Sequence, residues 1–216
     1  MTGGPRTDWS LAASHVGLAP RPSAVDWQTM SDQPALPFDR TAAEAAVRAL
    51  LRSLGQNPDA PELQDTPARV AEFWTERLAG YGVDLAAELK PLPGDLAPVP
   101  VILERIPFVS TCEHHLAPFE GHATIGYLPG AGGTVGLSKL VRVVQAYAWR
   151  LQVQERMAQQ IADALQTHLR PAAWGVQLVA VHTCMGHRGV KTPGVPVRTT
   201  LMGGAWEANP PAPFRT

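Results

Sequence analysis

The 216-residue sequence contains only two cysteines, which excludes a disulfide framework of the kind that stabilises small secreted domains. No apolar run approaches the ~20 residues that a membrane-spanning helix needs. The N-terminal segment also lacks a basic stretch followed by an apolar one, so it does not resemble a secretory signal peptide. These absences predict a protein that works in the cytoplasm without a membrane partner.

Acidic residues are scarce in one part of the chain. The whole chain has a formal net charge of −1, yet residues 136–200 contain eight basic residues against two acidic ones, a net charge of +6. A cationic segment in a near-neutral protein indicates a polyanionic ligand. Nucleic acid usually requires a broader basic surface with interleaved aromatic residues. The pattern therefore favours a phosphorylated small molecule over nucleic acid.

Both cysteines stand in short stretches that also contain histidine. The sequence reads Cys-Glu-His-His over 112–115, and Cys184 follows two residues after His182. Cys112 and His115, three residues apart in a turn, can bind one ion, and Cys184 can supply a third ligand from a distant part of the chain. Three protein ligands leave Zn²⁺ a fourth position for water, which is typical of catalytic zinc sites.

Two further histidines, His114 and His182, lie beside these ligands and are suited to move protons near a metal-bound water. Other interpretations remain open on the residues alone. The cysteines can be small buried apolar side chains, or they can form a Cys112–Cys184 disulfide, which is unusual in a reducing cytosol. A closed structural zinc site is open too, if His114 or His182 supplies the fourth ligand. The enrichment of histidine and cysteine in two short stretches favours a metal site.

The chain divides by composition into an arm and one domain. Residues 1–40 are rich in proline and small residues without a hydrophobic period, which predicts a mobile N-terminal arm. Residues 41–216 are expected to form a single catalytic domain, with a helical part over 41–98 and an α+β core over 99–216. Apolar periodicity predicts helices over 41–54, 66–80, 137–150 and 153–169. Apolar, β-branched stretches predict strands over 99–109, 119–128, 176–184 and 195–202, with a loop over 91–100.

Several local expectations follow from these elements. Thr66 is expected to be a helix N-cap followed by proline at the first helical position. The glycine-rich stretch 129–134 is expected to be a hairpin connection. His182 and Cys184 are expected to share one strand face, because side chains in a strand repeat every two residues. A short antiparallel sheet with helices on one side has open edges, so we expect subunits to assemble into a ring that closes a barrel.

The motifs from about residue 41 onward resemble GTP cyclohydrolase I, a family of zinc enzymes that open the purine ring of GTP. The matching stretches are Thr-Pro-Ala-Arg (66–69), Cys-Glu-His-His (112–115), Ile-Gly-Tyr-Leu-Pro (125–129), Gly-Leu-Ser-Lys-Leu (136–140), Leu-Gln-Val-Gln-Glu-Arg (151–156), His-Thr-Cys-Met (182–185), Arg-Gly (188–189) and Gly-Gly (203–204). So many spaced matches in order are far more specific than any single motif. The resemblance implies a tunnelling-type fold (T-fold), in which subunits build a β-barrel with helices outside, and a homodecamer with active sites between subunits.

By position, the resemblance assigns Zn²⁺ to Cys112, His115 and Cys184, and acid/base catalysis to His114 and His182. The implied reaction converts GTP into 7,8-dihydroneopterin triphosphate and formate, the first step of tetrahydrofolate and pterin biosynthesis. Zinc lowers the pKa of its bound water toward neutrality, which suits the hydrolytic steps.

The substrate contacts implied by the resemblance fall mostly in the cationic segment. Glu155, with Gln154, would hold the guanine edge, because a carboxylate accepts from the N–H and amino groups that distinguish guanine from adenine. The triphosphate would be held by Ser138, Lys139, Arg142 and Arg188, with Arg69 reaching in from a neighbouring subunit. On the residues alone, Glu155 is equally a helix-surface carboxylate paired with Arg156 or Gln159, and each cation is a solvated surface charge.

Two features depart from the family pattern. The residues Val-Pro-Val over 195–197 interrupt a stretch that is usually rich in serine and threonine, although Thr199 and Thr200 remain. His187 stands directly before Arg188, where the family pattern does not lead us to expect histidine.

Two other functions fit part of the sequence. Another enzyme of the same fold, a deazapurine nitrile reductase or a pterin synthase, would need a nucleophilic cysteine or a three-histidine site. The set Cys112, His115 and Cys184 disfavours both. A non-catalytic, zinc-stabilised assembly protein would explain the cysteines and the oligomer, but it would not explain His114, Glu155 and the cationic segment.

Overall fold

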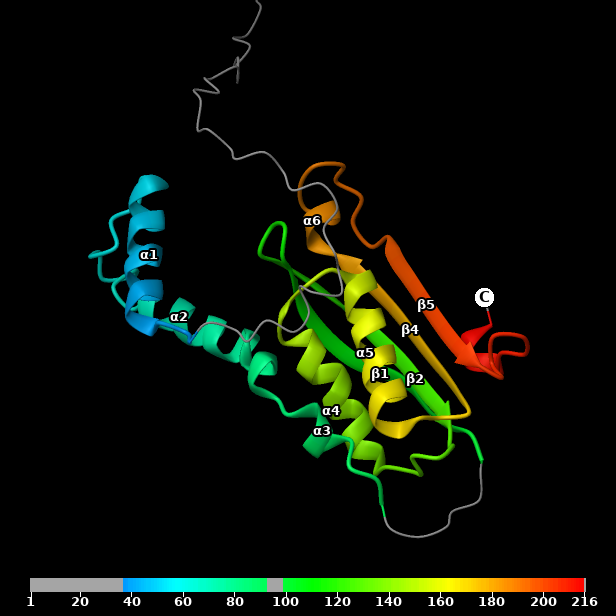
Figure 1. Cartoon of the computed structure of the whole chain (residues 1–216). Helices are drawn as coiled ribbons and strands as arrows, with labels where there is room; N and C mark the ends of the chain where they lie inside the picture. The colour runs from blue at the N-terminus through cyan, green and yellow to red at the C-terminus, as the bar shows by residue number, and fades with distance from the viewer. Residues whose placement is uncertain (1–36, 93–98, 216) are drawn as a thin grey trace, which may run out of the picture. The chain divides into compact units, whose positions relative to one another are not determined.

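The computed structural model describes residues 37–92 and 99–215 (Figure 1). The arm predicted over 1–40 lies outside the described residues except for its last four, and so does most of the loop predicted over 91–100. Within the described part of the chain, no helix is long and apolar enough to cross a membrane.

The N-terminal part of the domain is helical, as predicted. Its elements are α1 (Arg40–Ser53), α2 (Thr66–Arg77), the 3₁₀ turn η1 (Ala79–Gly82) and α3 (Leu85–Glu88). The N-cap of α2 is Asp65 rather than Thr66, so the predicted cap is wrong by one residue.

The helix α2 also ends before Gly80, which donates a backbone hydrogen bond to the carbonyl oxygen of Trp149 at 3.0 Å. A side chain on Gly80 would collide with the backbone of Ala146, so only glycine allows this close contact with the end of α4.

A five-stranded sheet forms the centre of the domain, in the order β3-β1-β2-β4-β5. The strands are β1 (Val101–Cys112), β2 (Ala117–Leu128), β3 (Leu151–Gln152), β4 (Ala173–His182) and β5 (Pro196–Gly204). All pairings are antiparallel except that of β3, whose two residues pair in parallel with Thr111 and Cys112 at the end of β1. The predicted α+β class is confirmed, whereas β3 was not predicted.

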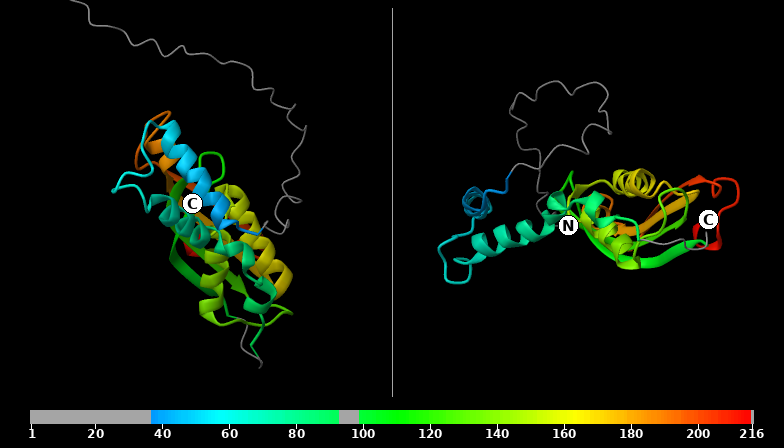
Figure 2. Two further views of the ribbon diagram at one scale, coloured as in Figure 1. Left: turned by 90° about the vertical axis from the view of Figure 1, so that its left-hand side faces the viewer. Right: turned by 60° about the horizontal axis from the view of Figure 1, so that its bottom comes forward.

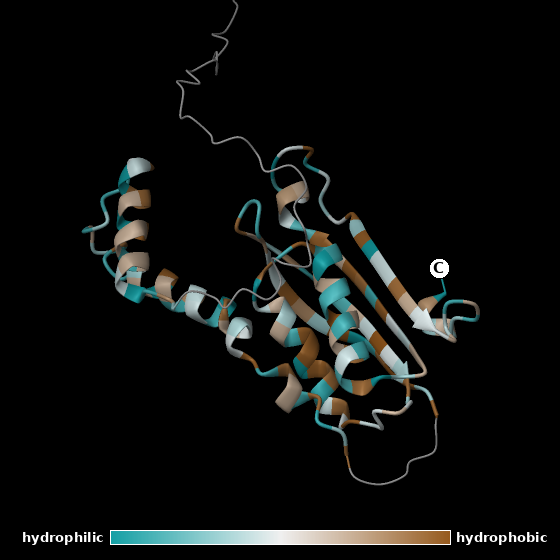
Figure 3. Cartoon of the chain, in the orientation of Figure 1, coloured by the Kyte–Doolittle hydropathy of each residue, from teal (hydrophilic) through white to brown (hydrophobic). Residues whose placement is uncertain are grey.

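Two helices, α4 (Leu137–Ala148) and α5 (Gln154–Leu169), cover one face of the curled sheet (Figures 1 and 2). They bury their apolar sides against the strands, and the polar side of α5 is turned outward (Figure 3). The largest fully buried side chains of this core include Phe119, Ile125, Tyr127, Leu140, Met157, Ile161, Leu165 and Leu178. A smaller cluster of Trp206 and Phe214, next to the 3₁₀ turn η2 (Ala212–Phe214), packs where Gly175 leaves room.

Two sequence expectations about connections are wrong. The stretch 129–134 leads from β2 into the segment before α4 and joins no hairpin, because β2 pairs with β1 and β4. Gly132 serves close approach, since a side chain there would overlap the backbone of Leu169 at the end of α5. Gly133 instead adopts a left-handed conformation with a φ of 76° and closes a turn with Gly130. Cys184 does not share a strand face with His182, because β4 ends at His182 and Cys184 lies in the one-turn helix α6 (Thr183–Gly186).

Candidate metal centre and active site

Three candidate ligands converge at one end of the sheet. Cys112 ends β1, His115 lies in the turn between β1 and β2, and Cys184 lies in α6. Their ligand atoms lie within 4.8 Å of one another, and Cys112 Sγ is 3.6 Å from His115 Nδ1. The turn is closed by the backbone N–H of Leu116, which donates to the carbonyl oxygen of Cys112 at 2.8 Å. The two halves of the site, 112–115 and 184, therefore meet as the sequence predicts, although Cys184 arrives from a helix.

The donor set fits a zinc ion. Two sulfur atoms and one imidazole nitrogen suit Zn²⁺ in number and softness. Both cysteines are free, so the disulfide alternative is not found. Burial raises the pKa of the Cys184 thiol, the neighbouring Cys112 raises it further, and Arg188 acts in the opposite direction. The raised pKa disfavours the thiolate of Cys184 unless a cation such as a metal ion lies beside it.

His182 is held by a stacked ring and one hydrogen bond. Its imidazole lies parallel to Phe119, with ring centroids 4.6 Å apart and an interplanar angle of 4°. Its Nε2 lies 2.9 Å from Oε1 of Gln154. Burial lowers the pKa of His182, and the charge of Glu155 partly opposes this. The neutral imidazole of His182 is thus favoured near Cys112, His115 and Cys184, the three candidate ligands that we call the metal group.

The hydrogen-bond network around Gln154 assigns the tautomer of His182. The Nε2 atom of Gln154 donates to the carbonyl oxygen of Val197 and to Thr199 Oγ1, both at 3.1 Å, and to the carbonyl oxygen of Leu178 at 3.4 Å. Because the amide nitrogen faces these acceptors, the amide oxygen faces His182, whose Nε2 must carry the proton. The Nδ1 atom of neutral His182 is then free to accept a proton.

His114 is the more exposed of the two candidate acid/base histidines, with 59% of its side chain accessible. Its Nε2 lies 3.8 Å from Oε1 of Glu113, and its ring packs edge-on against His115 with centroids 6.3 Å apart. Glu113 in turn forms a two-pronged ion pair with Arg156 of α5. The turn that carries two candidate ligands and a candidate acid/base group is therefore attached to α5.

The two residues that the resemblance assigns to guanine differ sharply in exposure. Gln154 is 1% exposed, and its amide is engaged with His182 and the strands β4 and β5. Glu155 is exposed, and among the described residues it forms no hydrogen bond or ion pair. Its expected surface partners are taken, because Arg156 pairs with Glu113 and Gln159 donates to Asp163. Glu155 is therefore available to a ligand.

The candidate triphosphate residues are not all brought together. Arg188 lies beside the metal group, with Nη1 2.8 Å from Nε2 of His115. Lys139 and Arg142, near the start of α4, instead pair with Glu88 at 2.9 and 3.3 Å, and these two contacts lower the pKa of that carboxyl. Figure 1 shows α3 and the start of α4 at the opposite end of the sheet from α6.

Ser138 and Arg69 also lie apart from the metal group. Ser138 is exposed beside Lys139 in the first turn of α4. Arg69 of α2 pairs with Asp65, the N-cap of the same helix, at 3.1 Å, and both side chains are mostly exposed. Within one chain, the structure joins Arg188 to the metal group and leaves the other four candidate phosphate contacts elsewhere.

The two threonines that remain near the departure from the family pattern, and His187, form hydrogen bonds within the chain. Thr199 and Thr200 use their hydroxyl oxygens to accept hydrogen bonds from Gln154 and Gln177. The exposed His187 donates its backbone N–H to the carbonyl oxygen of Thr183, which closes α6. The hydroxyls that remain in β5 are thus engaged within the sheet.

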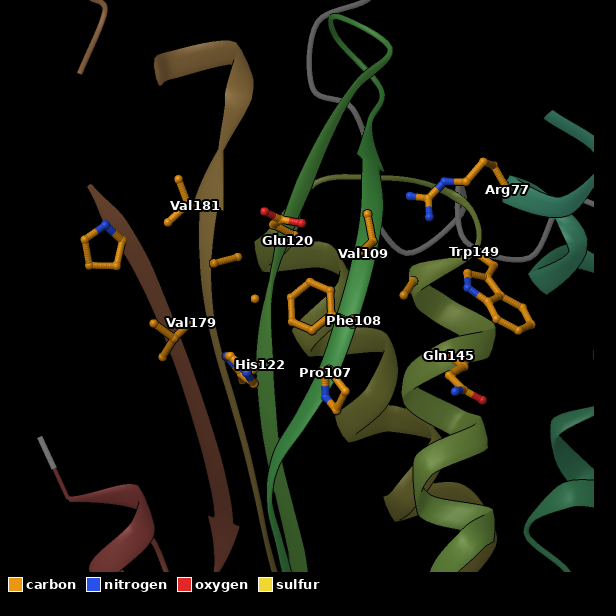
Figure 4. Close-up of a pocket in the computed structure, with 14 residues that line it drawn as sticks. Arg77, Pro107, Phe108, Val109, Glu120, His122, Gln145, Trp149, Val179 and Val181 are labelled. Carbon is orange, nitrogen blue, oxygen red and sulfur yellow. The ribbon is translucent and has the colours of Figure 1, made fainter. Parts of the chain in front are cut away.

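A separate pocket of about 640 Å³ lies against β1, β2, β4 and the end of α4 (Figure 4). Its polar lining includes Arg77, Glu120, His122 and Gln145. None of the candidate site residues lines it, so it is separate from the candidate metal centre.

Sequence reasoning gave no role to three residues that shape the site, Phe119, Glu113 and Arg156. Phe119 belongs to a regular apolar strand pattern, which carries no sign that its ring supports a histidine. Glu113 did carry a signal, since a carboxylate between two metal-binding residues needs a partner when it is largely buried. Arg156 carried a signal as well, because it is a basic residue in a predicted helix, directly after Glu155, and a basic residue can pair with such a carboxylate.

Comparison with known proteins bears on this site. The family model described as GTP cyclohydrolase I matches residues 43–213. The chain is 47% identical over 173 residues to a protein named GTP cyclohydrolase 1 from Mycolicibacterium vanbaalenii, covering 80% of this chain and 86% of that protein. A protein of the same name from Mycobacterium avium is 46% identical over 173 residues, covering 80% of this chain and 85% of its own length. These matches confirm the resemblance found in the sequence.

One solved structure, described as the archaeosine synthase QueF-Like in the apo form, has a TM-score of 0.35 and 17% sequence identity. It covers 49% of this chain and 95% of that chain. A likeness this weak supports no argument about fold or activity.

Proposed function

Because the chain belongs to the GTP cyclohydrolase I family, we propose that it converts GTP into 7,8-dihydroneopterin triphosphate and formate with the help of one zinc ion per subunit. The observation that carries the proposal is the meeting of Cys112, His115 and Cys184 within 4.8 Å. This group lies beside His182, a histidine held for proton transfer, and near Glu155, an exposed carboxylate that forms no hydrogen bond or ion pair within the described part of the chain. Such an arrangement suits hydrolysis of a guanine ring.

Cys112, His115 and Cys184 would hold the zinc ion, leaving one coordination position open. The ion, when bound, supplies an acidified water for the hydrolytic steps. The exposed imidazole of His115 and the half-buried thiol of Cys184 leave the site accessible from outside. A closed structural site would need a fourth protein ligand, and among the described residues neither His114 nor His182 belongs to the group whose ligand atoms lie within 4.8 Å of one another.

His182 is proposed to exchange a proton with the purine through its free Nδ1. Gln154 and Phe119 hold the ring, so the proton transfer needs no prior rotation of the side chain. In this proposal Gln154 positions His182 through its side chain. It can still serve guanine through its backbone N–H, since the N–H groups of a first helical turn have no helical acceptor.

His114 is proposed as the second acid/base group, because its exposed ring adjoins His115 and Glu113. Glu155 is proposed to accept hydrogen bonds from the N–H and amino groups of guanine. Its position in the first turn of α5, directly after Gln154, which contacts His182, supports this role, because the base would then lie close to the proposed proton-transfer group. Adenine offers no matching donors to this carboxylate, which gives selectivity.

The triphosphate is proposed to be bound by residues of more than one subunit. Arg188 would contribute from the subunit that holds the metal, and Ser138, Lys139 and Arg142 from a neighbour, because these three lie at the other end of the same sheet (Figure 1). Arg69 would reach in from a neighbour as well. The open edges β3 and β5 and the helices confined to one sheet face support the T-fold assembly, for which we propose a homodecamer.

We place the reaction in the cytoplasm, as the first step of tetrahydrofolate and pterin biosynthesis. The two free thiols support a reducing compartment, because their use as metal ligands requires that they stay reduced.

The test is incubation of the zinc-loaded protein with GTP, followed by oxidation and detection of fluorescent neopterin, with formate measured in parallel. We expect both products from GTP and neither from ATP. Elemental analysis should find about one zinc per subunit. Stoichiometric zinc without any product from GTP would instead support a non-catalytic, zinc-stabilised assembly protein.

A further inference from the structure

A largely buried ion pair attaches the metal-binding turn to α5. The guanidinium of Arg156 contacts both carboxylate oxygens of Glu113, through Nη1 to Oε1 at 3.2 Å and through Nη2 to Oε2. Only 11% of the Arg156 side chain and 21% of the Glu113 side chain are exposed. A two-pronged arginine–carboxylate contact fixes orientation as well as distance, unlike a contact made by a single point charge.

The arginine is itself fixed from a second side. Its Nε donates to Oε1 of Gln152 at 3.2 Å, and its Nη2 donates to the carbonyl oxygen of Leu151 at 3.1 Å. Gln152 is 1% exposed and donates to the carbonyl oxygen of Tyr147 at 3.0 Å and to Oε1 of Gln160 at 2.8 Å. The guanidinium of Arg156 is thus held in one orientation by both residues of β3, and Gln160 of its own helix fixes one of these, Gln152. This orientation does not depend on the contact with Glu113.

Glu113 lies between two residues with assigned roles in the turn. It follows Cys112 directly and precedes His114, whose Nε2 is 3.8 Å from its carboxylate. Its backbone N–H donates to the carbonyl oxygen of Gln152 at 3.1 Å, so both its backbone and its side chain are attached to the segment that contains β3 and the start of α5. Any rotation of the turn must break these contacts.

We propose that Arg156 is a positioning residue, which acts through Glu113 to orient the 112–115 turn and thereby sets the affinity of the metal site and the place of His114. The inference rests on the proposed zinc site. It also explains why one helical turn contains Gln154, Glu155 and Arg156, since each of them connects to a different part of the site: the His182 ring, the base and the metal-binding turn.

A purely structural role for the pair makes a different prediction. If the ion pair only stabilised the fold, its loss would lower the unfolding temperature and leave the metal site of the folded protein unchanged. If it orients the turn, the folded protein should bind zinc more weakly, because changes in the partners that orient metal ligands typically cost about 10–100-fold in affinity or activity.

The experiment measures zinc affinity by competition with a chromophoric chelator, for the full-length wild type and for Arg156→Lys, Arg156→Gln, Glu113→Gln and the double variant Glu113→Gln/Arg156→Gln. Arg156→Lys is decisive, because it keeps the charge but cannot form the two-pronged contact. We expect it to fold and assemble like the wild type, yet to bind zinc at least about 10-fold more weakly. The double variant should lose no more affinity than the weaker-binding single variant, because the two residues act as one unit.

A spectroscopic readout and a matched control complete the design. Co²⁺ loaded in place of zinc reports the geometry of a Cys₂His site through its absorption bands, and we expect shifted bands in the Arg156 and Glu113 variants. The control pair is Arg48–Asp59, an exposed ion pair between α1 and the following segment. Arg48→Lys and Asp59→Asn should leave zinc affinity and the cobalt spectrum unchanged.

The outcomes separate this inference from the proposed function. A wild-type protein that binds no zinc would refute the proposed zinc site itself. Wild-type zinc affinity and an unchanged cobalt spectrum in folded Arg156→Lys would overturn the inference while the function stands. Additive losses in the double variant would also overturn it, since they would mean that each residue acts on the metal independently.

Discussion

Replacing Gln154 by leucine tests whether this residue serves His182 or the substrate. Leucine has a similar size and suits a position that is 1% exposed, so it should fill the space without overpacking. The change removes the contact of His182 Nε2 at 2.9 Å, together with the donations to Val197, Thr199 and Leu178 at 3.1, 3.1 and 3.4 Å.

The structure gives a magnitude for the loss of stability. A typical intramolecular hydrogen bond contributes about 0.5–1.5 kcal/mol net, and the longest of these four contributes least, so we expect the free energy of unfolding to fall by about 3 kcal/mol. For a domain of this size that corresponds to a drop of about 6–12 °C in melting temperature. No candidate metal ligand changes, so zinc content should stay at the wild-type level.

The catalytic loss should appear in kcat. Gln154→Leu frees His182 Nε2, and only the stacking on Phe119 still restrains the ring. We expect kcat to fall by about 10–100-fold, below the upper range for removing an acid/base group. Steady-state kinetics with neopterin fluorescence would measure this, and Gln159→Leu, an exposed glutamine of the same helix, is the matched control. A wild-type kcat with a raised KM for GTP would refute the reasoning, because it would mean that the Gln154 side chain binds guanine.

The remaining predictions address the metal, the proton, the base and the phosphates in turn. Cys184→Ser should lose zinc and activity together, and elemental analysis that finds stoichiometric zinc would remove Cys184 from the ligand set. His114→Ala should retain zinc and assembly while its rate falls at least ~10²-fold, so a loss of zinc would make His114 a ligand. Glu155→Gln should lower kcat/KM for GTP and narrow the preference over ATP, and unchanged GTP kinetics would place guanine recognition elsewhere. Glu88→Gln removes the carboxylate paired with Lys139, so tripolyphosphate should bind about 2- to 5-fold more tightly by calorimetry, and weaker binding would contradict its role as a competing anion.

The sequence predicted the long elements well because each has a period over many residues. The apolar repeat of 137–150 corresponds to α4, and the apolar, β-branched stretch over 119–128 corresponds to β2. The strand β3 has only two residues, which carry no period, and its pairing with Cys112 exists because α4 and α5 bring it there. The glycines of 129–134 do form a turn, in which the backbone N–H of Gly133 donates to the carbonyl oxygen of Gly130, but this turn leads from β2 toward α4 and not to a second strand of a hairpin.

The candidate ligands were predictable from residue type, and their surroundings were not. Cysteine and histidine in two short stretches suffice to suggest a metal, even though the strand-face argument for Cys184 failed. Gln154 gave no sign of its burial, because glutamine in a first helical turn is usually exposed. The pairing of Glu88 with Lys139 joins residues 51 apart in the chain, and no local pattern encodes such a contact.

The origin of the ligands from two distant segments has a consequence for folding. Cys112 and His115 lie between the first two strands, whereas Cys184 follows β4, so a bound ion cross-links the chain across a loop of about 70 residues and restricts the unfolded ensemble. The site does not exist until β4 has paired with β2, so a metal ion would be captured late in folding and its binding energy would stabilise the finished sheet. Zinc supply should therefore govern the lifetime of the protein against proteolysis as well as its turnover, and chelation should first expose the segment from α6 to the start of β5.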